Sequence, residues 1–285
     1  MKPLPLKSPA KLNLFLKVNG KRPDGYHDLT TLFERIDLCD ELLFQKNISG
    51  KIRIFCQHPH VPKGKTNLVY KAAMLLQNRF SVKSGVDVTI TKRIPVAAGL
   101  GGGSSNAATT LLGLNILWSL RLNRAQLVSF AKEIGSDVPF FLYRESWAIG
   151  TERGDRIKPL KLNARLWQIL IVPRLKVYTR EIFATLNLKL TKKKADVNIL
   201  QRALRKNDLP KVGRLLRNDL ETAIVQSHPS LIKIKEKLKR FPTLGVLFSG
   251  SGPAVFGLVS SKKVALDLKA SLCRQYRQVF VVRTN

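Results

Sequence analysis

Long apolar runs are missing from this chain of 285 residues, and their absence argues against a membrane protein. A membrane-spanning helix requires about 18 or more consecutive apolar residues, and no such run occurs. The first residues, Met1-Lys-Pro-Leu-Pro5, lack the apolar central region of a signal peptide. We therefore expect a cytoplasmic protein with no membrane partner.

Cysteine is scarce as well. The chain has three cysteines, Cys39, Cys56 and Cys273, an odd number whose spacing does not suit metal ligation. We expect them to be reduced, which argues against a disulfide scaffold or a zinc site. His58 and His60 have no acidic or cysteine neighbours at ligand spacing, so we interpret that segment as a loop.

Acidic residues are few: 19 Asp and Glu stand against 50 Lys and Arg, a formal charge of +31. Such an excess is typical of nucleic-acid-binding proteins, and a positive field also attracts small polyanions. The basic residues are spread over the whole chain, with Lys192–Lys194 as the longest run, and no aromatic residues alternate with them. A base-stacking platform needs such aromatics. We expect no nucleic-acid partner, although an RNA-binding role remains the alternative.

The chain does contain a segment rich in glycine and other small residues between Pro95 and Ala108. Its glycines allow successive N–H groups to turn toward one concave point, where a nucleotide phosphate fits. Ser104 and Ser105 are expected to cap a helix starting near Asn106, whose positive end adds to the attraction. The predicted nucleotide-binding residues are Pro95, Val96, Ala97, Ala98, Gly99, Leu100, Gly101, Gly102, Gly103, Ser104 and Ser105.

The surroundings of this glycine loop decide how it is interpreted. A flexible turn would have the same composition, but an alternating strand precedes the loop and an apolar helical stretch follows it. A Walker loop is excluded because no lysine follows Gly103. A dinucleotide fingerprint fails because Ser104 occupies the third glycine position, and the acidic residue expected about 20 positions later is missing.

Hydrophobic periodicity predicts a mixed α+β chain of two domains, residues 1–160 and 161–285. Leu231, Ile234, Leu238 and Phe241 share one helical face. In the first domain, helices are expected over 67–79, 105–120 and 124–134, with strands over 51–55 and 86–90. The second domain is expected to end in the order strand, turn, strand, helix, strand, with strands over 246–248, 255–259 and 279–282.

Three further segments join the glycine loop in a recognisable order. Ser8-Pro-Ala-Lys-Leu-Asn-Leu-Phe-Leu16 and Arg22-Pro-Asp-Gly-Tyr-His27 precede it, and Phe248-Ser-Gly-Ser-Gly-Pro-Ala-Val-Phe256 follows. Together they resemble the motifs of the GHMP kinases, the small-molecule kinases that include galactokinase, homoserine kinase and mevalonate kinase. The resemblance implies a two-lobed α+β fold: an N-terminal ribosomal-protein-like βαβ domain that binds ATP, a C-terminal ferredoxin-like domain, and a cleft between them.

Within the family, Asp-Gly-Tyr-His27 and Gly-Ser-Asp-Val-Pro139 resemble the motifs of one branch. Its members use ATP to phosphorylate the 2-hydroxyl of a methylerythritol that carries a cytidine diphosphate group, in the non-mevalonate route to isoprenoids. The resemblance therefore implies a small-molecule substrate with a cytidine diphosphate moiety. Homoserine or mevalonate kinase activity would keep the fold and change the acceptor. Ala97 and Ala98 stand where this branch often has glycines, which restricts the backbone at the start of the loop.

The resemblance assigns the catalytic roles to Asp137 and Lys11. Asp137 matches the aspartate that takes the acceptor's proton, and Lys11 matches the lysine that stabilises the developing negative charge. On residue type alone, Ser-Asp-Val-Pro139 is typical of a helix cap. A lysine at an alternating strand position normally points to solvent, which is the alternative for Lys11.

The remaining assignments concern the acceptor and the metal ion. The resemblance implies that Asn13 contacts the diol end of the acceptor, that Tyr26 and Phe183 stack on the cytosine, and that His27 reads its edge. A turn tyrosine and a core phenylalanine are the alternatives for the stacking pair. Mg²⁺ is expected with ATP, with Ser105 as its protein ligand.

Phe248–Phe256, the third family motif, is also compatible with a plain hairpin turn, which needs only its glycines, and we give its serines no chemical role. For the assembly we expect a monomer or a weak homodimer.

Overall fold

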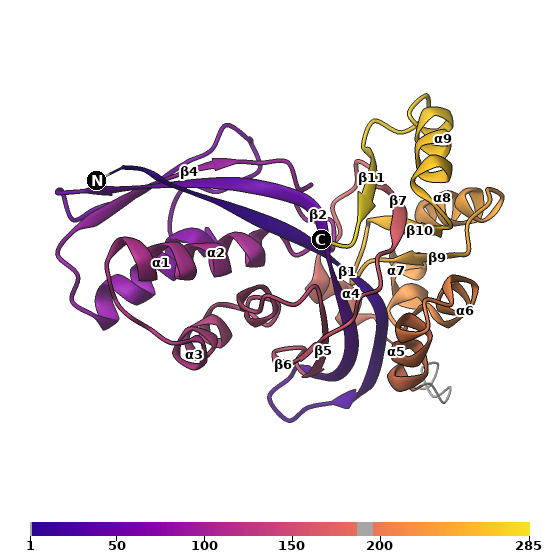
Figure 1. Ribbon diagram of the computed structural model, residues 1–285, viewed down its shortest axis with the longest axis horizontal. Coiled ribbons are helices and arrows are strands. Elements are labelled where there is room, and N and C mark those ends of the chain that lie inside the picture. Colours follow the sequence, from indigo (N-terminus) through magenta and orange to yellow (C-terminus); the bar gives the residue numbers. More distant parts are fainter. Residues whose placement is uncertain (1, 187–195) are drawn as a thin grey trace. The chain divides into compact units, whose positions relative to one another are not determined.

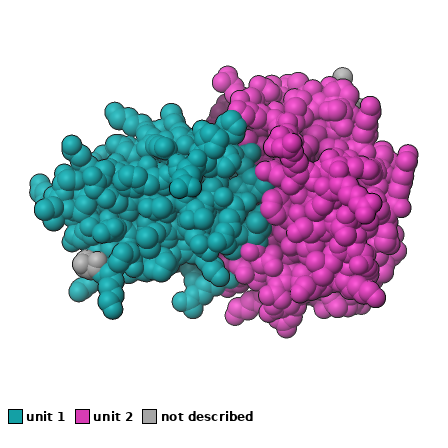
Figure 2. All heavy atoms as spheres, turned by 90° about the horizontal axis from the view of Figure 1, so that it is seen from above, with its two compact units in different colours: residues 1–10, 38–96, 101–144 teal, residues 11–37, 97–100, 145–285 magenta. Residues whose placement is uncertain are grey.

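The computed structural model describes residues 2–186 and 196–285, which form two compact units (Figure 2). Unit 1 comprises Met1–Ala10, Leu38–Val96 and Gly101–Arg144, and unit 2 comprises Lys11–Asp37, Ala97–Leu100 and Glu145–Asn285. The units are therefore interleaved along the chain, and the division into residues 1–160 and 161–285 stays a prediction. The basic run Lys192–Lys194 lies outside the described residues.

Two long strands explain this interleaving. β1 (Leu4–Lys21) and β2 (His27–Asn47) each contribute residues to both units. They belong to a seven-stranded sheet with the order β3-β4-β2-β1-β8, in which β5 pairs with both β2 and β6. The other strands are β3 (Ile52–Phe55), β4 (Gly85–Thr91), β5 (Trp147–Glu152), β6 (Arg156–Leu160) and β8 (Arg217–Asn218).

Unit 1 packs its helices against its part of this sheet (Figure 1). α1 (Leu68–Arg79) is capped by the Asn67 side chain, and α3 (Arg124–Ile134) by a capping box of Asn123 and Gln126. α2 (Gly102–Leu117) approaches β2 closely, because a Cβ at Gly113 would lie 2.9 Å from the ring of Phe44. A short 3-10 helix, η1 (Pro139–Leu142), follows α3. The helices predicted at 67–79 and 124–134 correspond to α1 and α3.

Unit 2 contains a second, four-stranded sheet with the order β11-β7-β10-β9. Its strands are β7 (Trp167–Ile171), β9 (Gly245–Phe248), β10 (Val255–Val259) and β11 (Val279–Arg283), all paired antiparallel. α8 (Ser230–Lys239) and α9 (Lys262–Leu272) pack on it, and the expected order strand, strand, helix, strand is confirmed. The remaining helices are α4 (Thr179–Ala184), α5 (Val197–Arg205), α6 (Leu209–Leu215) and α7 (Glu221–Ser227).

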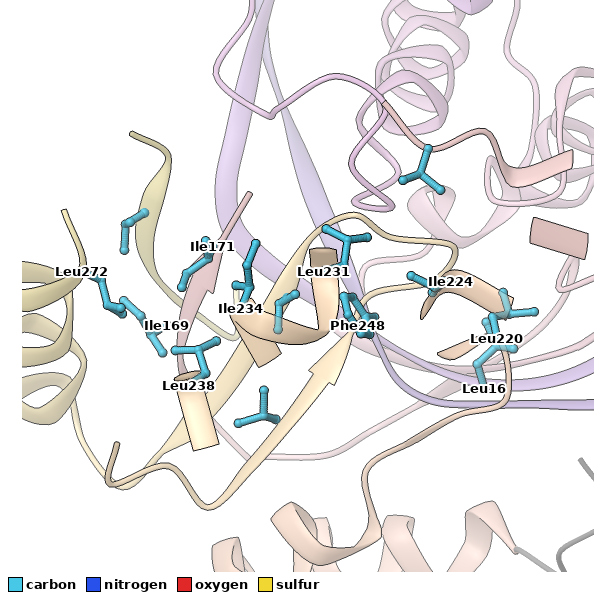
Figure 3. Packing of buried hydrophobic residues seen from close by; sticks show 14 of the residues in the cluster. Leu16, Ile169, Ile171, Leu220, Ile224, Leu231, Ile234, Leu238, Phe248 and Leu272 are labelled. Atoms are coloured by element: carbon cyan, nitrogen blue, oxygen red, sulfur yellow. The ribbon is translucent and has the colours of Figure 1, made fainter. Parts of the chain in front are cut away.

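The core of unit 2 lies between this sheet and its helices. Ile169 and Ile171 of β7 pack with Leu231, Ile234 and Leu238 of α8 in one buried cluster (Figure 3). The predicted helical face is thus confirmed, although the helix itself ends before Phe241. Within the two described ranges, no helix has both the length and the apolar character needed to cross a membrane.

Candidate functional site

Lys11 and Asn13 lie two positions apart on β1, inside unit 2. Their exposed fractions are 4% and 2%, so the expectation that a lone strand lysine points to solvent is wrong here. Lys11 Nζ donates to Asn13 Oδ1, and Asn13 Nδ2 donates to Thr31 Oγ1 at 2.8 Å. Thr31 in turn donates to the Phe15 carbonyl at 2.8 Å. This series of hydrogen bonds fixes the Asn13 amide and presents its oxygen to the Lys11 ammonium group, as a buried charge requires.

The start of the glycine loop is joined to the third motif. Gly99 has a φ of +76°, and a Cβ there would lie 2.1 Å from the Ser249 carbonyl oxygen, so no side chain fits. Ser249 Oγ donates to the Gly99 carbonyl at 3.1 Å, and the Ala254 N–H donates to the Ala98 carbonyl at 3.2 Å. The third motif is therefore both the turn between β9 and β10 and a support for the loop.

Gly250 brings the third motif to Lys11. With a φ of +55°, a Cβ on Gly250 would lie 3.2 Å from Asn13 Oδ1 and 3.4 Å from Lys11 Nζ. Asn218 of β8 holds this turn, because its Nδ2 donates to the Phe248 and Gly250 carbonyls at 2.9 and 2.7 Å. Residues of all three motifs thus meet within unit 2. Sequence reasoning missed Asn218 as the residue that holds this turn.

The helix after the glycine loop begins earlier than expected. Its N-cap is Gly101, with a φ of +68° and no side-chain cap, so the prediction that Ser104 and Ser105 cap a helix near Asn106 is wrong. The left-handed turn at Gly101 starts the helix without a capping side chain. Gly102, Gly103 and Ser104 form its first turn, where amide groups have no acceptor within the helix and favour an anion.

The other predicted loop residues surround this turn. Ala97 has a φ of +54°, in the left-handed region that favours glycine. Pro95, Ala98 and Leu100 are buried, whereas Val96 and Ala97 are exposed.

A buried polar network, here called the Asp40 network, supports the loop from within unit 1. Asp40 is fully buried, and its Oδ1 accepts the N–H groups of Arg93 and Ile94 at 2.8 Å each. Its Oδ2 accepts from Lys92 Nζ and, at 2.9 Å, from Asn106 Nδ2. The carboxylate therefore ties the segment before the loop to α2. Sequence reasoning missed Asp40, because its partners lie far away along the chain.

Ser105 belongs to the same network. It is fully buried, and its Oγ accepts a hydrogen bond from Ser8 Oγ at 2.8 Å. Asn106 Nδ2 donates to Ser8 Oγ as well, at 2.9 Å. A metal ligand needs an oxygen that the ion can reach, so this hydroxyl does not fit the predicted role. The described residues contain no group of three or more His, Cys, Asp or Glu side chains suited to a metal ion.

Asp137 lies in unit 1, in the turn between α3 and η1, and is half-buried. Val138 is the N-cap of η1, and its side chain makes no capping hydrogen bond. The helix-cap alternative for Asp137 stays a prediction.

The predicted acceptor residues gather at one end of β2 in unit 2. The His27 and Phe183 rings stack with centroids 5.0 Å apart and an interplanar angle of 28°. Phe183, on α4, also packs against the hydrophobic core, so part of the core alternative holds. Tyr26 is 56% exposed, with the guanidinium of Arg153 at 5.3 Å from its ring centroid. Partial burial, followed by the charge of Lys21, lowers the pKa of His27, which favours the neutral ring.

Two family models and several known proteins match this chain. Residues 67–145 match the family model described as GHMP kinases N terminal domain, and residues 200–278 match GHMP kinases C terminal. The 4-diphosphocytidyl-2-C-methyl-D-erythritol kinase of Exiguobacterium sibiricum is 42% identical over 278 residues, which cover 98% of this chain and 96% of that protein.

Solved structures agree with this family match. The crystal structure of a 4-(cytidine 5'-diphospho)-2C-methyl-D-erythritol kinase has a TM-score of 0.85 and 32% identity, covering 99% of this chain and 100% of that one. Homoserine kinase from Cytophaga hutchinsonii has a TM-score of 0.75 at 21% identity, covering 100% of this chain and 95% of that one. This second likeness concerns the fold alone.

Proposed function

We propose that this chain, which belongs to the family of GHMP kinases, phosphorylates 4-diphosphocytidyl-2-C-methyl-D-erythritol. The γ-phosphate of ATP goes to the 2-hydroxyl, giving the 2-phosphate and ADP, as a step in the non-mevalonate route to isoprenoid precursors. The observation that carries the proposal is the meeting of Lys11, Gly99 and Gly250, one residue from each family motif, within unit 2. The bacterial relative and the solved kinase structure described above are named for this activity.

The glycine loop and the start of α2 are assigned to the phosphates of ATP. The left-handed backbone at Gly99 and Gly101 supports a concave group of amides, and the first turn of α2 adds its positive end. We propose that residues 95–105 line this nucleotide site. Ser105, at the end of this segment, holds the helix to Ser8 through its hydroxyl group.

Asp137 is proposed as the general base and Lys11 as the electrostatic stabiliser. As the acceptor oxygen bonds to the γ-phosphorus, its proton passes to the Asp137 carboxylate, and the bond from that phosphorus to the ADP oxygen breaks. Lys11 is proposed to balance the charge that grows on the acceptor oxygen. The burial of Lys11 supports this role, because its charge acts in a medium less polar than water.

Recognition of the acceptor is assigned to four residues of unit 2. Asn13, fixed by Thr31, is proposed to contact the diol end. Tyr26 and Phe183 are proposed to stack on the cytosine, while the neutral His27 ring offers one donor and one acceptor to the base edge.

Magnesium accompanies ATP in phosphoryl transfer, where it offsets the phosphate charge. The Ser105 hydroxyl group is buried and accepts a hydrogen bond from Ser8, so we do not propose it as a ligand of the ion.

The localisation, the oligomeric state and the absence of a nucleic-acid partner stay predictions. A cytoplasmic monomer or weak homodimer without a nucleic-acid partner is expected. If the charge served RNA binding, RNA affinity would fall steeply as salt rises, while ATP turnover would persist.

The function is tested by ADP release with three acceptors: the diphosphocytidyl-methylerythritol, homoserine and mevalonate. We expect turnover with the first alone. Preference for homoserine or mevalonate would support the alternative activities within the same fold.

The catalytic assignment is tested with Asp137→Asn and Lys11→Ala. Loss of the base should lower kcat by about 10² to 10⁴-fold while ATP affinity stays nearly unchanged. Normal turnover of Asp137→Asn would remove this residue from the mechanism.

A further inference from the structure

We propose that Arg153 is a positioning residue for the pyrimidine end of the acceptor, because it covers one face of the Tyr26 ring and leaves the other face to the base. This inference rests on the proposed function, which places a cytosine on Tyr26. The guanidinium carbon lies 5.3 Å from the ring centroid, within the range of a cation–π contact. Both residues belong to unit 2.

The loop that carries Tyr26 has a fixed backbone but an exposed side chain. The Arg22 N–H donates to the Tyr26 carbonyl at 2.8 Å, and the Gly25 N–H donates to the Arg22 carbonyl at 3.2 Å. The Tyr26 N–H itself donates to Asp24 Oδ1 at 3.1 Å. These bonds hold the main chain and leave the ring, 56% exposed, to rotate about its side-chain torsions. A contact on the ring is needed to select one orientation.

Arg153 is itself held in place by Asp155. Its Nη2 and Nε lie 2.5 and 3.2 Å from Asp155 Oδ2, and Asp155 is 3% exposed. Both residues stand in the tight turn between β5 and β6, where Glu152 and Gly154 have positive φ values of 59° and 88°. The Gly154 N–H closes this turn on the Thr151 carbonyl at 3.0 Å. The guanidinium therefore reaches Tyr26 from a rigid support.

The buried carboxylate also gives Arg153 a structural part, which the test must separate. Among the described residues, Asp155 Oδ1 has no hydrogen-bond partner, so Arg153 supplies the charge that balances this carboxylate. Removing Arg153 alone would leave a buried charge unpaired, at a cost to stability. Replacing both members of the ion pair removes that cost and still uncovers Tyr26.

The experiment compares Arg153→Met, Arg153→Met/Asp155→Asn and the control Arg156→Met, each in the full-length protein. Arg156 lies in the same hairpin with its side chain 74% exposed, and pairs with Glu152 at 3.5 Å. We expect KM for the diphosphocytidyl acceptor to rise about 2 to 5-fold in both Arg153 variants, as for loss of an exposed cation–π contact. KM for ATP and kcat should stay unchanged, and Arg156→Met should behave as the unaltered protein.

A coupling measurement then shows whether Arg153 acts through Tyr26. The dissociation constant of cytidine 5'-monophosphate, measured by calorimetry, should rise by the same factor in Arg153→Met. In a Tyr26→Leu background the Arg153 change should have no further effect. An unchanged acceptor KM in both Arg153 variants, or an equal effect in the Tyr26→Leu background, would overturn the inference. Failure of the unaltered protein to phosphorylate the acceptor would instead overturn the proposed function.

Discussion

The Asp40 carboxylate in unit 1 is buried and hydrogen-bonded, whereas the Tyr26 side chain in unit 2 is exposed. Asp40 joins the segment before the glycine loop to the helix after it. The Tyr26 ring makes a cation–π contact with the guanidinium of Arg153. A phosphate group requires fixed amides, while a flat base can be bound by rings that adjust. The first region should therefore contribute to stability, and the second to acceptor affinity.

The largest effect is expected from the Asp40 network. Asp40→Asn removes the carboxylate charge and leaves the Lys92 ammonium buried without a counter-charge. We expect the free energy of unfolding, measured by urea denaturation, to fall by about 3 to 5 kcal/mol. The double variant Asp40→Asn/Lys92→Met should recover part of this loss, because it removes both charges. If the single and double variants were equally unstable, the ion pair would not be the cause.

A second buried carboxyl, Glu34, sharpens the comparison because its hydrogen-bond partners Gln168 and Thr284 carry no charge. Burial raises its pKa to about 8, while hydrogen bonds from Thr284 and Gln168 limit the shift. The folded state therefore binds this proton more tightly than the unfolded state, and stability falls as pH rises from about 4.5 to about 8. Glu34→Gln cannot ionise, so it should lack this fall and be more stable than the unaltered protein at pH 8, by an amount on the order of 3 kcal/mol.

The measurement for Glu34 is urea denaturation at pH 5 and pH 8. The difference between the variant and the unaltered protein should grow with pH, and the exposed Glu236→Gln serves as the control. A difference that is equal at both pH values would contradict the raised pKa.

Tyr26→Ala should affect binding and spare stability. Loss of one stacking ring should weaken acceptor binding by about 1 to 3 kcal/mol, seen as a higher acceptor KM with an unchanged KM for ATP. Phe55→Ala, at an exposed aromatic on β3 in unit 1, is the matched control. Unfolding free energies of both variants should lie close to that of the unaltered protein. An unchanged preference for a cytidine-bearing acceptor would make the stacking assignment wrong.

The smallest effect is expected at the start of the glycine loop. Ala97 has a φ of +54°, a conformation that costs an alanine roughly 1 kcal/mol and costs glycine little. Ala97→Gly should therefore leave stability unchanged or raise it by up to about 1 kcal/mol, since greater freedom of the unfolded chain offsets part of the gain. A marked loss of stability by thermal denaturation would show that the alanine methyl group makes contacts that outweigh the backbone strain.

Much of the fold was predictable where the signals are local. α3 was predicted at its observed bounds from hydrophobic periodicity, and alternation revealed β4, whose Val86, Val88 and Ile90 are buried. The α+β fold of the GHMP kinases is confirmed by the family models and by the structural likeness. β1 and β2 were not predicted at their full lengths, although Leu12, Leu14 and Leu16 occupy alternate positions of β1.

The candidate site divides in the same way. Its motifs marked Lys11, Gly99 and Gly250, whose glycines and spacing are visible in a single segment of sequence. Asp40 and Arg153 were missed because their roles depend on partners that the fold brings from distant segments. The helix start was misjudged because Gly101 begins the helix through its left-handed backbone, while serines are the residues that usually mark a cap.

The account's central claim is tested most directly by phosphorus NMR of the product formed from ATP and 4-diphosphocytidyl-2-C-methyl-D-erythritol. The account predicts ADP together with a new phosphate monoester that shows no three-bond coupling to a proton, because the carbon bearing the 2-hydroxyl carries a methyl group and no hydrogen. A monoester resonance split by a carbinol proton, or ADP accompanied only by inorganic phosphate, would contradict it.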